Sequence, residues 1–430
     1  MLPYAVIGAG PMGLCTARRL KQVDIPFIGF ETNSDVGGLW DIDSPTSTMY
    51  QSAHLISSRT MTEFTEFPMP PGTPAYPGHA LMKHYFQAYA TQFELYPSYR
   101  FRTSVIEAKP VQDHWQLLVE DQQGQHMVSV AGVLIANGTL HKPKRIRLPG
   151  DYTGTRLHSA AYKTADIFDG QRVLIIGCGN SGCDIAVDAV HHARSVDIVV
   201  RRGYYFLPKF VMGKPIDTIG GKIKLPNRLK QAVDGAIIRM LVGKPSDYGL
   251  PDPDYRLYES HPVVNSLVLH HLGHGDITPR PGIASIAEKT VVFEDQSQSE
   301  YDLILEATGY ELDYHFIDQS LLNWQGAAPM LYLNVFHPER DDLFLMGMVE
   351  AAGLGWQGRD DQARLVALYL KQLTEQKASA FQFRKIKQQQ VARRCDGGMT
   401  YLNLDRMAYY VHKGEYLSLI HQHIQALEDH

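Results

Sequence analysis

Two segments of this chain repeat one local design, and this repeat limits what the chain can fold into. The segments are PYAVIGAGPMGLCTARRL, residues 3–20, and RVLIIGCGNSGCDIAVDAV, residues 172–190. Each has a short apolar run, then Gly-x-Gly-x-x-Gly, then apolar residues at helical spacing, which predicts a strand, a tight turn and a helix. The apolar runs PFIGFE, residues 26–31, and SVDIVVRR, residues 195–202, predict the strand that follows each helix. The chain is therefore expected to contain two βαβ nucleotide-binding units.

The rest of the pattern predicts an α/β fold. Strand-like runs at 133–138, 303–309 and 343–348 alternate with helical segments, which favours parallel sheets. The stretch from about 204 to 285 is rich in Tyr, Pro and His and is expected to form helices and loops, and the chain from about 360 onward is expected to be helical. We expect two Rossmann-like dinucleotide-binding domains, with the second inserted into the first. The expected boundaries are 1–160 with 305–430 for the first domain and 161–304 for the second.

The composition excludes several function classes. The 430 residues carry 41 Lys and Arg against 46 Asp and Glu, a net charge of −5, without a block of five like charges. This balance does not favour nucleic acid as a partner. No apolar run approaches the roughly 18 residues of a membrane span, and the amino terminus lacks the pattern of a signal peptide. Four scattered cysteines suit a reducing compartment, so we expect a cytoplasmic protein without a disulfide framework.

The first glycine motif has the features of an FAD or NAD site. Gly8 permits the tight turn, Gly10 lets the backbone approach a pyrophosphate, and Gly13 allows the helix to pack closely on the strand. Glu31 ends the next strand, where a carboxylate accepts hydrogen bonds from a ribose diol but repels a 2′-phosphate. This site is therefore expected to prefer FAD or NAD to NADP.

The second glycine motif ends differently. Gly177, Gly179 and Gly182 repeat the turn, but the following strand ends in Arg201 and Arg202. Guanidinium groups bind a 2′-phosphate bidentately. The economical assignment is FAD in the first unit and NADPH in the second.

The sequence does not favour a redox disulfide or a metal site. Cys178 and Cys183 have the spacing of a redox disulfide, but both lie inside the dinucleotide turn itself, which favours small apolar packing. The histidines show no metal-binding motif such as His-Glu-x-x-His, so no metal site is expected.

Four further motifs, taken with the two glycine turns, resemble the flavin-containing monooxygenase family of class B flavoprotein monooxygenases. They are GGLW at 37–40, YTGTRLHSAAY at 152–162, ATGY at 307–310 and QAR at 362–364. The second of these is similar to the family fingerprint, with His158 at its centre, and lacks the Trp that is typical of Baeyer-Villiger enzymes after its last position. The resemblance covers nearly the whole chain and favours the flavin-containing or N-hydroxylating branch.

The resemblance also implies site residues. For FAD they are Gly8, Gly10, Pro11, Met12, Gly13, Glu31, Gly38, Leu39, Trp40, His54, Val105 and Gln362. For NADP they are Gly177, Gly179, Asn180, Ser181, Gly182, Asp184, Arg201 and Arg202.

The sequence departs from the family at one catalytic position. The family carries an asparagine before its Phe-x-x-Phe-Pro run, and this chain has Ile56 there. Because isoleucine cannot hydrogen-bond an oxygenated flavin, either Ser57, Ser58 or Arg59 takes that role or more oxygen is released as peroxide. Ser58 and Arg59 are the catalytic candidates.

The resemblance implies an NADPH-dependent FAD monooxygenase that oxygenates a nitrogen or sulfur centre of a small molecule through a C4a-(hydro)peroxyflavin. The expected partners are this substrate and O2, with a homodimer as a possible assembly. Two alternatives stay open: a flavin NAD(P)H oxidase or reductase with poor oxygenation, motivated by Ile56, and a nucleotide-sensing flavoprotein without turnover.

Overall fold

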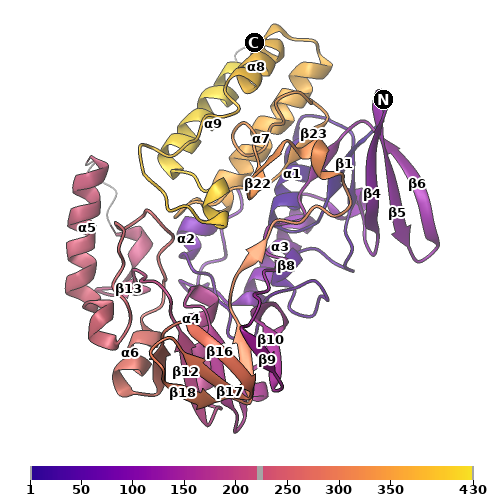
Figure 1. The fold of residues 1–430 in the computed structure, drawn as a ribbon. Helices are drawn as coiled ribbons and strands as arrows, with labels where there is room; N and C mark the ends of the chain where they lie inside the picture. The colour runs from indigo at the N-terminus through magenta and orange to yellow at the C-terminus, as the bar shows by residue number, and fades with distance from the viewer. Residues whose placement is uncertain (1, 220–225, 429–430) are drawn as a thin grey trace.

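The computed structural model describes residues 2–219 and 226–428. In Figure 1 the two ends of the chain, indigo and yellow, lie together in the upper lobe, and the middle of the chain, magenta to orange, forms the lower lobe. The fold is mixed α/β with two five-stranded sheets. The alternation of strands and helices in the sequence predicted this class.

The sheet of the upper lobe is parallel and has the order β23-β7-β1-β2-β3. Its strands are β1 (Tyr4–Ile7), β2 (Phe27–Phe30), β3 (Tyr99–Arg100), β7 (Val133–Ile135) and β23 (Leu343–Leu345). The strands expected at the first glycine motif, at 133–138 and at 343–348 are thus confirmed. Helices α1 (Pro11–Gln22), α3 (His79–Gln92) and α7 (Gly355–Thr374) belong to the same lobe. Because β23 pairs with β7, one sheet is built from strands that lie about 200 residues apart in the chain.

The sheet of the lower lobe is also parallel and has the order β10-β19-β11-β12-β15. Its strands are β10 (Thr155–His158), β11 (Arg172–Ile176), β12 (Ser195–Val199), β15 (Ile277–Arg280) and β19 (Leu303–Glu306). Helices α4 (Asn180–Val190) and α6 (Leu267–His274) pack together beside it. Four strands lie at least partly in the stretch that was expected to hold only helices and loops: β13 (Phe210–Val211), β14 (Lys214–Pro215), β15 and the start of β16 (Ile283–Glu288). The prediction was wrong for these strands. Among them β15 belongs to the main sheet of the lobe and has four residues. Their sequence, ITPR, has no apolar run, and the strand forms because its backbone pairs with β12.

Two accessory sheets were not anticipated. One is an antiparallel meander of β4 (Ser104–Val111), β5 (His114–Asp121) and β6 (Gly124–Val130). The other joins β16 (Ile283–Glu288), β17 (Thr290–Phe293) and β18 (Gln298–Glu300) to β9 (Gly150–Tyr152). Shorter two-stranded pairs are β8 (Lys142–Pro143) with β20 (Tyr310–Glu311), β13 (Phe210–Val211) with β14 (Lys214–Pro215), and β21 (Trp324–Gln325) with β22 (Ala328–Pro329).

The C-terminal part is helical, as expected, and packs on the upper lobe. Helix α7 is followed by α8 (Ala378–Gln389) and α9 (Lys413–Glu428). Helix α9 buries Tyr416, Leu419, Ile420, Ile424 and Leu427 in the same apolar core as α1 and α7. The remaining helices are the short α2 (Arg59–Thr62) and α5 (Asn227–Val242), which stands at the edge of the lower lobe in Figure 1. Among the described residues, no helix combines the length and the apolar character that crossing a membrane requires.

Candidate active site

Two of the three positions in the first glycine turn have no room for a side chain. Gly8 has a φ of 108°, and a Cβ there would lie 2.5 Å from the Ala136 carbonyl oxygen. A Cβ at Gly13 would lie 1.8 Å from the Gly8 carbonyl oxygen. At Gly10, in contrast, the nearest atom to such a Cβ is the Gly38 Cα at 3.6 Å, an ordinary van der Waals contact, so this position is less crowded than the other two. The turn is closed where helix meets strand and open where a phosphate group would approach.

The second glycine turn repeats this geometry in the lower lobe. Gly177 has a φ of 111° and lies under the Ala307 carbonyl oxygen, which a Cβ would approach to 2.5 Å. A Cβ at Gly182 would lie 2.0 Å from the Gly177 carbonyl oxygen, and at Gly179 it would meet no atom within 4 Å. Each lobe therefore holds one open cradle at the start of a helix.

Both cradles offer unsatisfied hydrogen-bond donors. Helix α1 begins after Gly10 with Pro11 in its first turn, and α4 begins after Gly179, and neither N-cap has a side chain that accepts from the first backbone N–H groups. These N–H groups and the positive end of the helix dipole favour an anion such as a pyrophosphate. Asn180 holds the rim of the second cradle because its Oδ1 accepts a hydrogen bond from the Val264 backbone N–H at 2.8 Å. Ser181 follows it in the first turn of α4.

Glu31 lies beside the first cradle and is fixed by backbone donors. Its Oε2 accepts from the Ala9 N–H at 2.7 Å, and its Oε1 accepts from the Asn33 backbone N–H at 2.8 Å. Burial raises the pKa of this carboxyl group, and the N–H donors oppose that shift. Val105 is buried in β4, two residues after Thr103, whose N–H donates to the Glu31 carbonyl oxygen. Glu31 and Val105 are thus brought to one end of the cradle.

The segment Gly38–Trp40 forms a single 3-10 turn against the start of α1. A Cβ at Gly38, whose φ is 58°, would lie 3.0 Å from the Gly10 Cα, so the two backbones are in contact. Leu39 lies in this turn, and the Trp40 ring meets the Trp356 ring edge to face at 6.3 Å. The turn brings these residues to the open side of the first cradle.

The resemblance implied three further residues for FAD, and two of them, Met12 and Gln362, contact Gly347 after β23. The Met12 side chain packs against Gly347, where a Cβ would meet its Cγ at 2.8 Å. Gln362 is fully buried, its Oε1 accepts from the Gly347 N–H at 2.9 Å, and its Nε2 donates to the Tyr416 hydroxyl at 2.6 Å. Gln362 therefore holds the segment after β23 in place. His54 is exposed, and its Nδ1 lies 2.5 Å from the Ser52 carbonyl oxygen.

The two arginines after β12 differ in their surroundings. Arg202 is held by Tyr204: the guanidinium carbon lies 4.9 Å from the ring centre, and Nε donates to the hydroxyl at 3.3 Å. Arg201 is exposed and makes no hydrogen bond or ion pair with the residues that the structure describes. Arg201 is therefore the free cation at the end of the strand that follows the second cradle.

Asp184 on α4 links the lobes. Its Oδ2 accepts from the Tyr50 hydroxyl at 3.2 Å, and its Oδ1 accepts from the Asn265 amide at 2.6 Å. The same loop of the upper lobe makes a second contact with α4, between Ser52 and Asp188. Burial raises the pKa of Asp184, which Lys209 and the two hydrogen bonds oppose. The Asp184 carboxylate is thus engaged by the Tyr50 hydroxyl and the Asn265 amide.

The run around Ile56 lies where the inserted stretch meets the upper lobe. The Ser58 backbone N–H donates to the Asp217 carboxylate at 2.6 Å, and the Tyr76 hydroxyl donates to the Lys209 carbonyl oxygen at 2.6 Å. The Ser58 side chain is buried, and the Arg59 guanidinium donates to the Pro70 carbonyl oxygen at 3.2 Å. Ile56 is 42% exposed. In this run the Ile56 side chain is thus partly exposed, whereas Ser58 and Arg59 make contacts within the protein.

His158 of the fingerprint is fully buried at the passage between the lobes. Its Nδ1 accepts from the Ala160 N–H at 3.1 Å, its ring meets the Tyr310 ring at 5.5 Å, and burial lowers its pKa. Tyr162 at the end of the fingerprint donates to Asp188 on α4 at 2.8 Å. These contacts fix the connection between the sheets.

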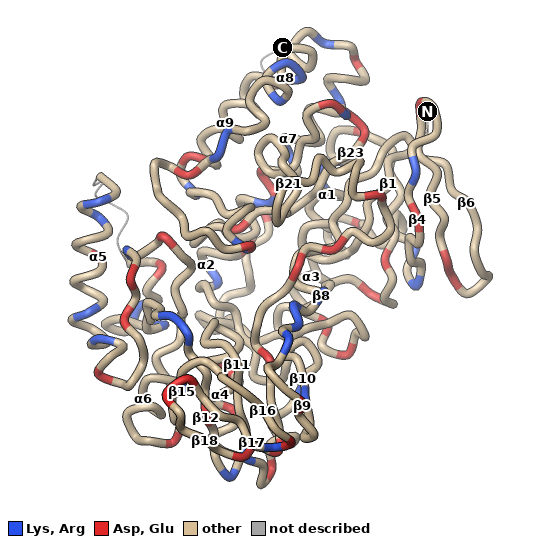
Figure 2. Tube along the Cα trace, viewed as in Figure 1, with Lys and Arg blue, Asp and Glu red and all other residues tan. Residues whose placement is uncertain are grey.

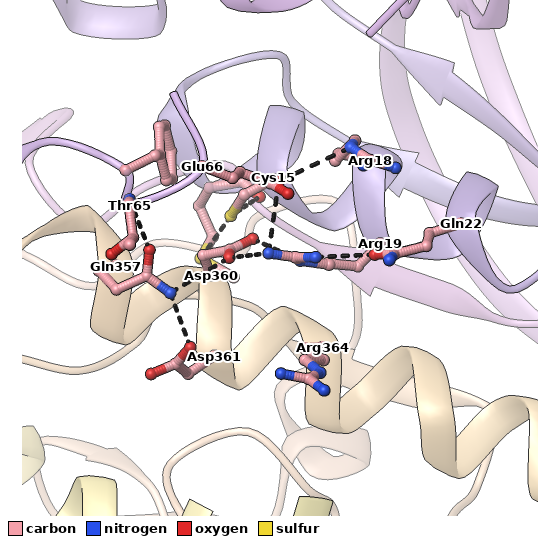
Figure 3. Close-up of polar contacts among 12 residues, drawn as sticks. Cys15, Arg18, Arg19, Gln22, Thr65, Glu66, Gln357, Asp360, Asp361 and Arg364 are labelled. Atoms are coloured by element: carbon pink, nitrogen blue, oxygen red, sulfur yellow. Dashed lines mark hydrogen bonds and ion pairs between the residues drawn. The ribbon is translucent and has the colours of Figure 1, made fainter. Parts of the chain in front are cut away.

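A buried ion pair ties the first cradle's helix to α7, and sequence reasoning missed it (Figure 3). Arg19 on α1 donates from Nε to the Asp360 Oδ1 at 2.8 Å and makes a second contact to Oδ2. The Asp360 side chain is fully buried, and Glu66 lies 3.3 Å from the same guanidinium. Burial disfavours the Arg19 cation, but the hydrogen bonds to Asp360 outweigh it and raise the pKa of Arg19. The one signal in the sequence was a pair of arginines on an otherwise amphipathic helix.

Other chemistry finds no support in the part of the chain that the structure describes. The sulfur atoms of Cys178 and Cys183 lie 3.5 Å apart, both side chains are buried, and all four cysteines are free. No group of three or more His, Cys, Asp or Glu side chains within residues 2–219 and 226–428 is placed to hold a metal ion.

Comparison with known proteins points to one family. The family model described as flavin-binding monooxygenase-like matches residues 3–426. Flavin-containing monooxygenase 1 of Mus musculus is 30% identical over 86% of this chain and 74% of its own length, and the Rattus norvegicus protein of the same name is 28% identical over 97% and 82%. Cyclohexanone monooxygenase from a Rhodococcus species, solved with NADP+, shares the fold with a TM-score of 0.73, 18% identity and coverage of 99% and 97%. S-allyl-L-cysteine S-oxygenase from Allium sativum shares it with a TM-score of 0.67, 19% identity and coverage of 99% and 88%.

Proposed function

Because the chain belongs to the flavin-binding monooxygenase-like family, we propose that it is an NADPH-dependent FAD monooxygenase acting on a nitrogen or sulfur centre of a small molecule. The family establishes a flavin monooxygenase with FAD and NADPH as cofactors. The observation that carries the finer proposal is the pair of open glycine cradles, one beside a carboxylate, Glu31, and the other followed by a free cation, Arg201.

The residues present fit both cofactors. An open glycine surface and unsatisfied helix N–H groups suit a pyrophosphate in each lobe, with Gly10 and Gly13 for FAD and Gly179 and Gly182 for NADPH. When bound, FAD supplies the oxygen chemistry, which we propose passes through a C4a-(hydro)peroxide as the resemblance implies. The chain binds and orients the cofactors and shields them from water. Gln362 fixes the segment at Gly347, and buried apolar side chains form the core of the first lobe.

We propose a discontinuous FAD domain, residues 1–160 with 305–430, and an NADP domain, residues 161–304. The pairing of β23 with β7 supports the discontinuous division. Strands β9, β10 and β19 pair with strands of the lower lobe, so residues 150–158 and 305–306 pack with the NADP domain although they fall on the FAD side of these boundaries. The same division makes Asp184 a contact between domains and a residue that sets their approach.

The first prediction concerns cofactor choice. Changing Arg201 to Ala should weaken NADPH binding by about 1.5–3 kcal/mol, the scale of hydrogen bonds to a charged group, and leave NADH nearly unaffected. The dissociation constants of both nucleotides would be measured by titration of the FAD-loaded protein. The control variant is Arg147→Ala, which removes another arginine of the chain. An equal loss for NADPH and NADH would show that Arg201 is structural.

A second prediction concerns Ile56. Changing Ile56 to Asn restores the hydrogen-bonding side chain of the family at a position that is 42% exposed, so it should raise the share of NADPH electrons recovered in product and lower the share in hydrogen peroxide. Ile167 to Asn, at a site that is 40% exposed, is the matched control and should change neither. We propose that Ser58 and Arg59 hold this run through Asp217 and Pro70. No gain in coupling from Ile56→Asn would remove this position from the catalytic account.

The experiment that tests the proposed function is a screen of NADPH oxidation over amines, thioethers, indoles and ketones. A substrate-dependent rate with an amine or thioether supports the monooxygenase. A rate that no substrate changes supports the oxidase alternative that Ile56 motivates. Absence of flavin reduction by either nicotinamide would favour the sensing alternative.

We also propose that the protein acts in the cytoplasm and that a homodimer forms there. Four free cysteines, two of them 3.5 Å apart without a bond, support a reducing compartment. Sedimentation of the FAD-loaded protein would test the assembly.

A further inference from the structure

A buried carboxylate at the end of β19 holds two arginines near the junction of the lobes. Glu306 is the last residue of β19, and its side chain is fully buried. Its Oε2 accepts a hydrogen bond from Arg145 Nη1 at 3.1 Å, and its Oε1 accepts one from Arg156 Nη2 at 2.5 Å. Two guanidinium groups thus share one carboxylate, which leaves one positive charge in excess at this place.

Arg145 is the member of this group that keeps donors for a ligand. Its side chain is 54% exposed, whereas that of Arg156 is 36% exposed and also donates to the Ile146 carbonyl oxygen. A guanidinium has five N–H donors in a rigid fork. With the residues that the structure describes, Arg145 forms a hydrogen bond only through Nη1. It is therefore a cation that Glu306 fixes in place and whose other donors remain available.

The strand order of the lower sheet puts Arg145 and Arg201 on opposite sides of the second cradle. The cradle follows β11, and β11 lies between β19 and β12. Arg201 comes shortly after the end of β12, whereas Glu306 pairs with Ile176, the residue before Gly177. Adjacent strands lie about 4.8 Å apart, so the carboxylate that holds Arg145 is one strand away from the cradle.

A dinucleotide at this cradle extends to both sides of it. With the 2′-phosphate at Arg201 and the pyrophosphate at Gly179, the nicotinamide half continues toward β19. The nicotinamide must also approach the upper lobe, which holds the first cradle. Arg145 lies on the segment that leads from β7 of the upper sheet to β9 and β10 of the lower lobe. Figure 2 shows basic residues on this connection, next to β8.

We propose that Arg145 binds the nicotinamide-side phosphate of the NADPH pyrophosphate and that Glu306 positions it for this contact. The proposal rests on the proposed function, because it takes NADPH as the ligand of the second cradle. Guanidinium groups bind phosphate oxygens through paired, charge-assisted hydrogen bonds. NADPH and NADH both carry this phosphate. Arg145 therefore contributes to the affinity for either nucleotide, whereas Arg201 distinguishes between them.

Titration of the FAD-loaded protein with three nucleotides tests the proposal. NADP+ and NAD+ bind without reducing the flavin, and 2′,5′-ADP has the adenosine half but lacks the nicotinamide-side phosphate. Arg145→Ala should weaken NADP+ and NAD+ by the same factor, roughly 10- to 100-fold, which is the scale of hydrogen bonds to a charged group. It should leave 2′,5′-ADP unchanged. Arg201→Ala should instead weaken NADP+ and 2′,5′-ADP and spare NAD+.

Two further variants separate the contact from a general effect on the fold. Arg145→Lys keeps the charge but lacks the fork that reaches Glu306 and a phosphate together, so its loss should be smaller than that of Arg145→Ala. Arg393→Ala is the matched control, because Arg393 pairs with Glu415 at 3.2 Å and is 42% exposed, but lies between α8 and α9. It should bind all three nucleotides as the parent does. Thermal unfolding of each variant verifies folding.

Two results would overturn the proposal. One is an Arg145→Ala variant that binds NADP+ and NAD+ as tightly as the parent protein. The other is an equal loss of all three nucleotides, 2′,5′-ADP included, which would show that Arg145 only maintains the structure of the lower lobe. A parent protein that binds no NADP+ would contradict the proposed function itself, and this proposal with it.

Discussion

Changing Gly182 to Ala is expected to leave FAD bound and to lower the rate of flavin reduction by NADPH by at least about 100-fold. The added Cβ would lie 2.0 Å from the Gly177 carbonyl oxygen and 3.2 Å from the Ala307 Cβ, so the start of α4 must move away from the turn. A displacement near 1 Å at a cofactor site costs about this much in rate. Anaerobic mixing with NADPH, followed by the loss of flavin absorbance, measures it.

Two other glycines make this experiment specific. Gly235 lies in the middle of α5, where a Cβ meets no atom within 4 Å, so Gly235→Ala should reduce flavin at the parent rate. Gly13→Ala places a Cβ 1.8 Å from the Gly8 carbonyl oxygen and should instead yield protein with little FAD. If Gly182→Ala lost FAD while Gly13→Ala kept it, the assignment of the two cofactors to the two lobes would be reversed.

Changing Asp360 to Asn is expected to destabilise the upper lobe by roughly 3–5 kcal/mol, because it leaves the Arg19 guanidinium without its buried counter-ion. The Asp360 side chain is fully buried, and Arg19 donates to it at 2.8 Å. Since α1 carries the first cradle at its N-terminus, the variant should also release FAD at a lower temperature. Urea unfolding and the fluorescence of released flavin on heating measure the two effects.

The control for this variant lies on the same helix. Lys21 pairs with Glu94 at 3.0 Å, but both are well exposed, at 40% and 81%, so Glu94→Gln should cost at most about 1 kcal/mol. The double change Arg19→Met, Asp360→Leu should recover most of the stability, because apolar residues replace a buried pair at little cost. A loss in Asp360→Asn no larger than that in Glu94→Gln would show that the pair does not hold α1 to α7.

Local patterns predicted much of the fold. Both glycine motifs, the strands that follow them and the helical C-terminal part depend on short-range signals, and the structure contains all of them. Strand β15 was missed because its four residues carry no apolar run and the pairing with β12 creates the strand. The meander β4–β6 and the pairing of β9 with β16 depend on contacts between strands, which no single window of sequence contains.

In the candidate site, too, local signals predicted the turns but not the contacts between distant residues. The turns at Gly8 and Gly177 could be read directly, because a positive φ and a nearby carbonyl group require glycine. The Arg19–Asp360 pair spans 341 residues, and the difference between a held Arg202 and a free Arg201 depends on where Tyr204 lies.

The measurement that tests the central claim most directly is one reaction in which NADPH consumed, oxygenated product and hydrogen peroxide are all quantified with a tertiary amine or a thioether as substrate. A flavin monooxygenase of this family should form one N-oxide or S-oxide for each NADPH consumed at the coupling limit, with the oxygen atom derived from labelled O2. Recovery of all electrons as hydrogen peroxide with every amine and thioether would contradict the claim.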